Sequence, residues 1–122
     1  MKFEEFVRRV GERAGIADRF EAERTAVVVL ELLCDRLTEK EAHDLLSQLP
    51  ALFNELVAYT PAQLPITADE FVDRVAGSLR ISPSEARTRI RAFFATLREA
   101  VTRGELQDVV ELLDPEYADL LA

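Results

Sequence analysis

The sequence predicts an all-α protein of about eight helices, arranged as two tandem four-helix repeats that form one compact helical bundle. Three observations predict this fold. Apolar residues recur at helical spacings of three and four, and no stretch alternates with period two for more than a few residues. Five pairs of a capping residue and a later glutamate mark helix starts. The first half of the chain also recurs in the second half.

The repeat consists of matching residues in a nearly constant register. The segment Glu5-Phe6-Val7-Arg8-Arg9-Val10 returns as Glu70-Phe71-Val72-Asp73-Arg74-Val75, an offset of 65 residues. From Glu21-Ala22 onward the offset is 64, and it pairs Leu33, Thr38, Glu41, Asp44, Leu49 and Leu56 with Leu97, Thr102, Glu105, Asp108, Leu113 and Leu120. We therefore expect one domain, 1–122, with repeats at 1–58 and 67–122. The linker 59–66 contains Pro61 and Pro65, which prevent a helix from continuing through it.

Four helices are expected in each repeat. In the first repeat a helix ends at Gly15, and its apolar face is formed by Phe3, Phe6, Val7 and Val10. A long helix follows from about Arg19 to Leu37, then a short helix that ends near Leu49, and a fourth that begins at Pro50. The same order is predicted for the second repeat, with a long helix from about Pro83 to Val101 and a last helix that begins at Pro115.

The helix starts carry a consistent signal. A Ser, Thr or Asp followed three residues later by Glu is a capping box, in which two side chains satisfy unpaired backbone N–H groups at a helix start. The pattern occurs at Asp18/Glu21, Thr38/Glu41, Thr67/Glu70, Ser82/Glu85 and Thr102/Glu105. These five positions predict where five of the helices begin.

The chain resembles a known family. The resemblance is carried by the repeated Phe-Val-x-x-Val stripe, by the Glu-Ala opening of the long helix, and by Leu49-Pro50 near the end of the third helix. These features resemble domain of unknown function family 2267, which comprises short bacterial all-α proteins with a tandem helical repeat. The resemblance covers nearly the whole chain and implies the fold, but it implies no activity. The second repeat departs from the pattern, because Leu113-Asp114-Pro115 moves the proline by one residue.

The composition excludes several classes of protein. The chain has 15 Lys and Arg against 23 Asp and Glu, a formal net charge of −8, which argues against binding to nucleic acid. The single cysteine, Cys34, excludes an internal disulfide, and the N-terminus shows no apolar signal segment. The longest apolar run, Ala26 to Leu30, is too short to span a membrane. We therefore expect a cytoplasmic protein with no membrane or nucleic-acid partner.

A basic face on the second long helix has two interpretations. Arginines gather at positions 80, 87, 89, 91 and 98, and Arg87, Arg91 and Arg98 share one face. The face could bind an anion or nucleic acid. The acidic balance and the lack of interleaved aromatic residues favour a solvated face that pairs with neighbouring glutamates.

The sequence contains no convincing catalytic, cofactor-binding or metal-binding set. His43 is the only histidine, and Cys34 is expected to be a half-buried small apolar filler rather than a nucleophile. The pairs Glu41/Asp44 and Glu105/Asp108 could bind a divalent cation if their helices faced each other. Glu41 and Glu105 are already explained as capping residues, so we predict no catalytic residues, no cofactor and no bound metal.

The two repeats differ most along their long helices. Val27, Val28 and Leu32 lie off the main apolar face of the first long helix, and their counterparts are Arg91, Ala92 and Thr96. A helix that is apolar nearly all round is buried, so this face should contact the second repeat or a second chain, in a monomer or a homodimer. We expect Leu32→Ala to destabilise the fold and Thr96→Ala not to do so.

Two functions are consistent with the sequence. The first is a non-enzymatic protein-interaction or regulatory module, which binds a protein partner or associates with itself, and we favour it because no catalytic constellation is present. Val27, Val28 and Leu32 are its candidate interface. The alternative is a small-ligand-binding protein or enzyme with a pocket between the two repeats.

Overall fold

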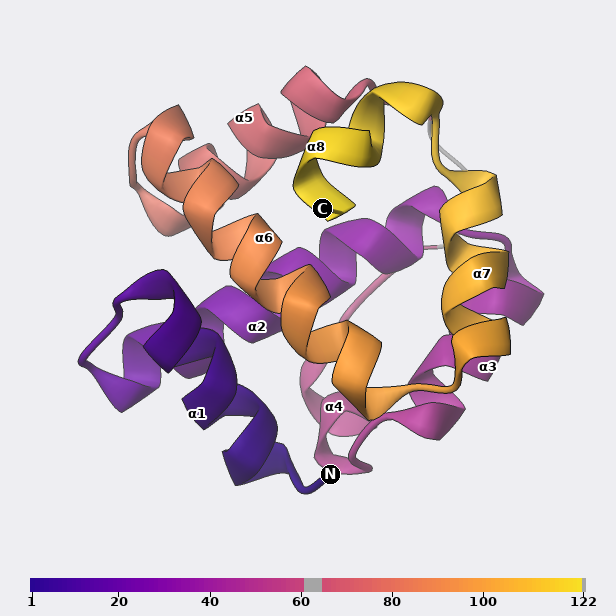
Figure 1. Ribbon diagram of the computed structural model, residues 1–122, viewed down its shortest axis with the longest axis horizontal. Coiled ribbons are helices and arrows are strands. Elements are labelled where there is room, and N and C mark those ends of the chain that lie inside the picture. Colours follow the sequence, from indigo (N-terminus) through magenta and orange to yellow (C-terminus); the bar gives the residue numbers. More distant parts are fainter. Residues whose placement is uncertain (61–64, 122) are drawn as a thin grey trace.

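The computed structural model describes residues 1–60 and 65–121, and within these ranges it is all helical, with no strand (Figure 1). The prediction of an all-α protein of about eight helices is confirmed. The helices are α1 (Phe3–Ala14), α2 (Arg19–Arg36), α3 (Glu39–Gln48), α4 (Leu52–Leu56), α5 (Ala68–Leu79), α6 (Pro83–Ala100), α7 (Arg103–Leu112) and α8 (Ala118–Leu121), with a 3₁₀ turn at Pro115–Tyr117. Residues 61–64 of the predicted linker 59–66 lie outside the described residues. None of the described helices combines the length and the apolarity needed to cross a membrane.

The cap residues start the helices where the sequence predicts. The side chains of Asp18, Thr38, Thr67, Ser82 and Thr102 each accept a hydrogen bond from the backbone N–H three residues later. The fourth helix is the exception. It begins at Leu52 instead of Pro50, without a side-chain cap, while Pro115 opens a 3₁₀ turn instead of a longer helix.

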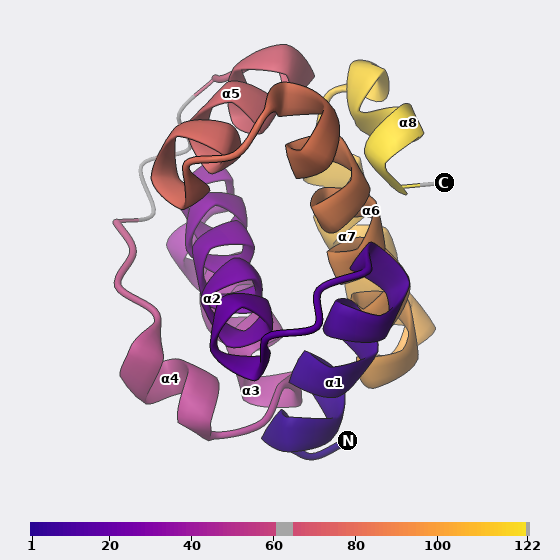
Figure 2. The same ribbon diagram turned by 90° about the vertical axis from the view of Figure 1, so that its left-hand side faces the viewer.

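The two long helices form the centre of the bundle, and the first helix of each half bridges them. Helix α1 packs against both α2 and α6, and α5 packs against both α6 and α2 (Figure 1). Helices α3 and α7 lie side by side at one end of the bundle (Figure 1). The second view shows α2 and α6 on opposite sides, with α1 and α5 spanning them (Figure 2). Each half therefore contributes a helix to the core of the other.

Aromatic side chains fill the core at corresponding places. Phe6 on α1 meets Phe53 on α4 with ring centroids 5.2 Å apart, and Phe71 on α5 meets Tyr117 with centroids 5.7 Å apart. Both pairs have an edge-on geometry, which aromatic quadrupoles favour. Phe6 also contacts Phe93 on α6 at 5.7 Å, which links the two halves. All five rings are fully buried.

The C-terminal ends of α1 and α5 have the same left-handed conformation but different residues. Gly15 has φ +73° and stops α1, while Arg80 has φ +57° and stops α5. Glycine adopts this conformation without steric cost, whereas a side chain brings Cβ too close to the following carbonyl oxygen. The second half therefore carries backbone strain that the first half avoids.

Replacing Arg80 with glycine should stabilise the protein. Left-handed backbone costs a non-glycine residue about 1–2 kcal/mol, and the added freedom of glycine in the unfolded chain offsets about 0.5–1 kcal/mol. We expect Arg80→Gly to raise the free energy of unfolding by about 0.5–1 kcal/mol, measured by urea titration. Gly15→Ala is the matched control and should lower it by about 1 kcal/mol. An Arg80→Gly variant that is less stable than the parent would contradict this explanation.

Candidate functional site

The predicted interface residues lie on α2 at the edge of the core. Val27, Val28 and Leu32 are each half-buried and pack against the main hydrophobic cluster. Val28 and Leu32 line a shallow hollow of about 150 Å³, and Ser78 at the end of α5 forms part of its border. The second half of the chain thus contributes one residue, Ser78, to the border of this hollow.

A larger depression lies elsewhere, within the first half. A groove of about 720 Å³ runs between α1 and the start of α2, and we call it the α1–α2 groove. It is lined by Lys2, Glu4, Glu5, Val7, Arg8, Gly11, Glu12, Ile16, Ala17, Arg19 and Ala22. Its apolar members are Val7, Gly11, Ile16, Ala17 and Ala22, and charged side chains make up the remainder. The groove is formed by one half alone and does not lie between the repeats.

Gly11 determines how closely the groove walls approach. A Cβ atom at Gly11 would lie 3.1 Å from the carbonyl oxygen of Ile16 and 3.2 Å from Cβ of Ala22, closer than ordinary van der Waals contact. The absence of a side chain at residue 11 therefore lets the loop after α1 lie close to the helix without displacing its neighbours. Phe20, next in sequence to the groove residue Arg19, is 77% exposed, the most of any large hydrophobic side chain in the described residues.

The sequence analysis did not identify the α1–α2 groove. Four of its eleven lining residues are charged residues of α1, for which apolar periodicity gives no signal. One signal was present, because Phe20 lies outside the apolar face of α2 and its counterpart at the offset of 64 is Ser84. A large apolar residue at a position where the other half has a polar residue indicates a surface that only the first half has.

The single cysteine is buried more deeply than the sequence predicts. Cys34 is fully buried on α2, and burial, followed by the charges of Asp35 and Glu31, raises the pKa of its thiol to about 12. The nucleophilic form of cysteine is the thiolate, so this group stays protonated and unreactive at neutral pH. His43 is exposed on α3.

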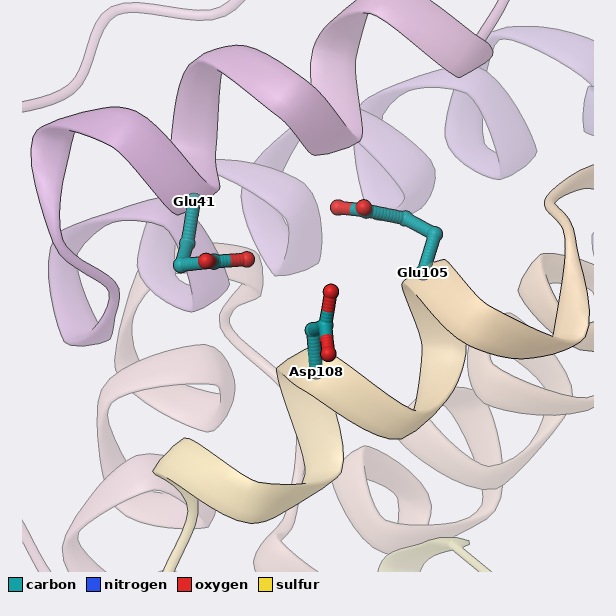
Figure 3. A group of neighbouring side chains, drawn as sticks. All are labelled: Glu41, Glu105 and Asp108. Atoms are coloured by element: carbon teal, nitrogen blue, oxygen red, sulfur yellow. The ribbon is translucent and has the colours of Figure 1, made fainter.

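Three carboxylates converge between α3 and α7. Glu41 points from α3 toward Glu105 and Asp108 on α7 (Figure 3). One oxygen of each carboxylate lies within 4.8 Å of one from each of the others. Burial, followed by the charges of Glu41, Asp44 and Asp108, raises the pKa of Glu105. The structure therefore brings Glu41 of the first acidic pair together with both members of the second pair, Glu105 and Asp108.

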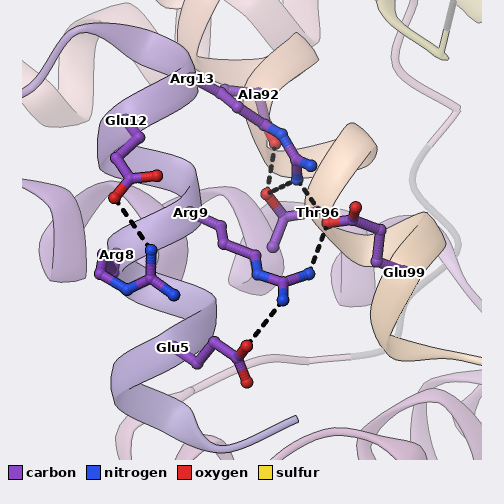
Figure 4. A network of polar contacts seen from close by, with 8 residues as sticks. All are labelled: Glu5, Arg8, Arg9, Glu12, Arg13, Ala92, Thr96 and Glu99. Carbon is purple, nitrogen blue, oxygen red and sulfur yellow. Dashed lines mark hydrogen bonds and ion pairs between the residues drawn. The ribbon is translucent and has the colours of Figure 1, made fainter.

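Thr96 lies in a contact that the sequence did not predict, so the expectation that Thr96→Ala is neutral needs revision. Thr96 on α6 is fully buried under α1, where its hydroxyl accepts a hydrogen bond from Arg13 at 2.8 Å and donates to the carbonyl of Ala92 at 2.9 Å (Figure 4). Thr96→Ala would remove this hydrogen bond between α1 and α6, so we now expect it to lower the free energy of unfolding. The sequence could not show this, because the partner of Thr96 lies 83 residues away in the chain.

The same contact contains a network of charges that joins α1 to α6. Glu99 Oε1 lies 2.8 Å from Arg13 Nη1 and 3.0 Å from Arg9 Nη1, and Arg9 also reaches Glu5 at 2.7 Å (Figure 4). The hydrogen bonds from Arg13 and then Arg9 lower the pKa of Glu99 to about 2. The anionic form of Glu99 is thus favoured in the folded protein.

The arginines of α6 bond within the chain. Arg87 pairs with Asp69 at 2.7 Å, and Arg89 binds both Glu21 at 2.9 Å and the Thr25 hydroxyl at 2.9 Å. Arg91 donates to the carbonyl of Asp119, and Arg98 donates to that of Leu121. These contacts fasten α6 to α5, α2 and α8, so the basic residues of this helix have structural partners.

The comparisons with known proteins identify a family. The family model described as Uncharacterized conserved protein (DUF2267) matches residues 3–120. The chain belongs to this family. No curated protein matches it.

The network around Glu99 predicts a pH-dependent stability. Because the pKa of Glu99 is lowered from 4.5 to about 2 on folding, its contribution is present above pH 4.5 and is lost as the pH falls toward 2. We expect Glu99→Gln to lower the melting temperature at neutral pH and the gap from wild type to close over this interval. Glu12→Gln, which removes a carboxylate paired only with Arg8 on its own helix, is the control and should show a smaller gap. A Glu99→Gln gap that stays constant with pH would contradict the assignment.

Proposed function

We propose that this member of the DUF2267 family is a non-enzymatic, cytoplasmic interaction module that binds a segment of a partner protein in the α1–α2 groove. The observation that supports the proposal is the groove itself, an apolar floor with a charged rim, together with the exposed Phe20, which follows the lining residue Arg19 in sequence. Exposed aromatic side chains next to an apolar depression are typical of protein interfaces, where aromatic residues supply much of the binding energy.

The lining of the groove favours a protein segment over a small ligand. Small-molecule sites present a few buried polar groups that converge on the ligand. Here the rim charges are at the surface, and Arg8 and Glu12 already pair with each other at 2.9 Å with more than half of each side chain exposed. Such a rim fits a partner whose apolar side chains enter the floor while its own charges stay in water.

The chemistry of the described residues also supports a non-enzymatic role. The buried Cys34 thiol, with its pKa raised to about 12, is not available as a nucleophile. The alternative, a small-ligand-binding protein or enzyme with a pocket between the repeats, has less support. The hollow that both halves border has a volume of about 150 Å³, small for a ligand site.

We further propose that the chain is one domain built from two repeats, and that Val27, Val28 and Leu32 contact the second repeat within the same chain. Equal helix lengths support the repeat, with 12, 18 and 10 residues in α1, α2 and α3 and the same in α5, α6 and α7. The position of Ser78 at the edge of the hollow supports the contact within the chain over a homodimer.

The groove can be tested by photo-crosslinking in the native cell. Benzoylphenylalanine in place of Phe20 should give a discrete adduct with one partner protein, and the same probe in place of the exposed counterpart Ser84 should not. With the partner purified, Phe20→Ser should weaken binding by at least about tenfold, the size expected for an interface hot spot. Equal adducts at both positions would contradict the proposal. A small molecule that copurifies with the wild-type protein but not with Phe20→Ser would favour a ligand-binding function instead.

The contact of Leu32 can be tested by a charge. If the second half covers this face, Leu32→Glu should lower the melting temperature by the same amount at every protein concentration, and wild type should run as a monomer. Phe20→Ser is the control, because it lies outside this contact. A melting temperature that rises with concentration, together with a folded Leu32→Glu monomer, would instead establish a homodimer through this face.

A further inference from the structure

We propose that Glu41, Glu105 and Asp108 form a site for a hard divalent cation of the Ca²⁺, Mg²⁺ or Mn²⁺ class between α3 and α7. This site is separate from the α1–α2 groove and is independent of the proposed function. It would bind the metal through carboxylate oxygens contributed by both halves of the chain.

The geometry fits a single ion. One oxygen from each carboxylate lies within 4.8 Å of one from each of the others. Oxygens bound to one Ca²⁺ lie about 2.3–2.6 Å from it and can be about 5 Å apart, so these separations suit Ca²⁺ directly. Oxygens bound to one Mg²⁺ lie about 2.0–2.1 Å from it and are at most about 4.2 Å apart, so the smaller ion would draw the side chains closer together. The three side chains extend from their helices toward the same point (Figure 3).

Glu105 provides an independent indication of a ligand. The residue is only 7% exposed, and its Oε1 is buried without a hydrogen-bond partner. Oε2 of Glu41, on the facing helix, is also buried and unpartnered. Buried carboxylates are normally paired or bound to metal, because an unpaired buried charge is costly. Within the described residues no Lys or Arg forms an ion pair with Glu41, Glu105 or Asp108.

Helix capping does not account for the carboxylate of Glu105. In a capping box, the glutamate would accept a hydrogen bond from the backbone N–H of its cap residue. The N–H of Thr102 instead donates to Oε1 of Gln48 on α3 at 2.8 Å, so this role of Glu105 is already filled. Glu105 keeps only the backbone half of the box, in which its own N–H donates to Thr102 Oγ1 at 3.2 Å. Its carboxylate is thereby left for another partner.

The ligand set determines the class of metal. All three side chains offer hard oxygen atoms, which suit Mg²⁺, Ca²⁺ and Mn²⁺, whereas zinc and copper sites are built mainly from nitrogen and sulfur. The exposed side chain of Asp108 leaves one side of the site open, so water can complete the coordination. A bound dication would also remove the mutual repulsion of three nearby negative charges.

The site would join the two halves directly. Glu41 and Glu105 are counterparts at the offset of 64, so the ion would sit where the two halves face each other. Thr25 and Arg89, which are also 64 residues apart, meet in the same way between α2 and α6 at 2.9 Å. A cation between α3 and α7 would therefore bind at the end of the bundle where like charges from the two halves meet.

The proposal is tested on metal-free protein with the cations themselves. After dialysis against a chelator, Ca²⁺, Mg²⁺ and Mn²⁺ are each added at constant ionic strength, and melting temperature and binding heat are measured. At least one cation should bind one per chain and raise the melting temperature by about 5–10 °C at a concentration of 100 times its Kd. Mn²⁺ should broaden the backbone NMR signals of residues 41 and 105.

Matched variants separate the site from general acidity. Glu105→Gln and Asp108→Asn should each weaken binding at least about tenfold, and Glu39→Gln, an exposed acid on the first turn of α3, should leave it unchanged. Asp108 is exposed, so its variant should fold even if Glu105→Gln does not. No response to any of the three cations up to about 10 mM, or equal responses in Asp108→Asn and Glu39→Gln, would overturn the proposal.

Discussion

The packing of each first helix against the long helix of the other half is the constraint on which the rest of the structure depends. Helix α1 lies against α6 as well as α2, and α5 lies against α2 as well as α6. Phe6 illustrates the result, because it contacts Phe53 within its own half and Phe93 in the other. Neither half buries its apolar residues alone, so α2 and α6 are held apart at the distance that α1 and α5 span.

This exchange of helices is not symmetric in its chemistry. The contact of α1 with α6 is fastened by Arg9, Arg13, Thr96 and Glu99. At the corresponding contact of α5 with α2, Arg24 donates a hydrogen bond to the carbonyl of Ser78, and Ser78 and Leu32 border the same hollow. The first contact therefore includes ion pairs, whereas the second has a hydrogen bond to a backbone carbonyl and retains a hollow. The surface around Phe20 also distinguishes the halves, and for the same reason: corresponding positions carry different residues.

The sequence predicts local structure well because local structure has local causes. The side chains of Asp18, Thr38, Thr67, Ser82 and Thr102 start their helices in the structure as they do in the pattern, since a cap and its amide are three residues apart. The first residue of α4 was harder to predict from the sequence. Pro50 allows a helix to begin there, but it does not require the helix to begin at that residue.

What the sequence could not predict depends on distant partners. Periodicity showed that one face of α6 includes Ala92 and Thr96, but not that Arg13 would cover it. The same limit applies to the acidic pairs. From the sequence alone, capping was a sufficient explanation for Glu105. In the structure, Gln48 accepts the hydrogen bond from the Thr102 N–H that Glu105 was expected to accept. The α1–α2 groove depends on the fold of a loop over Gly11, which no spacing rule describes.

The burial of Cys34 has a consequence for how the protein meets oxidants. The chain has one cysteine, so any disulfide it forms must join two molecules or a molecule and a small thiol. The folded protein keeps that sulfur fully buried and protonated, which blocks both the access and the thiolate that exchange requires. Disulfide-linked dimers therefore arise from molecules in which α2 has opened. Their amount measures how much of the protein has unfolded, and not how strongly the folded molecules associate.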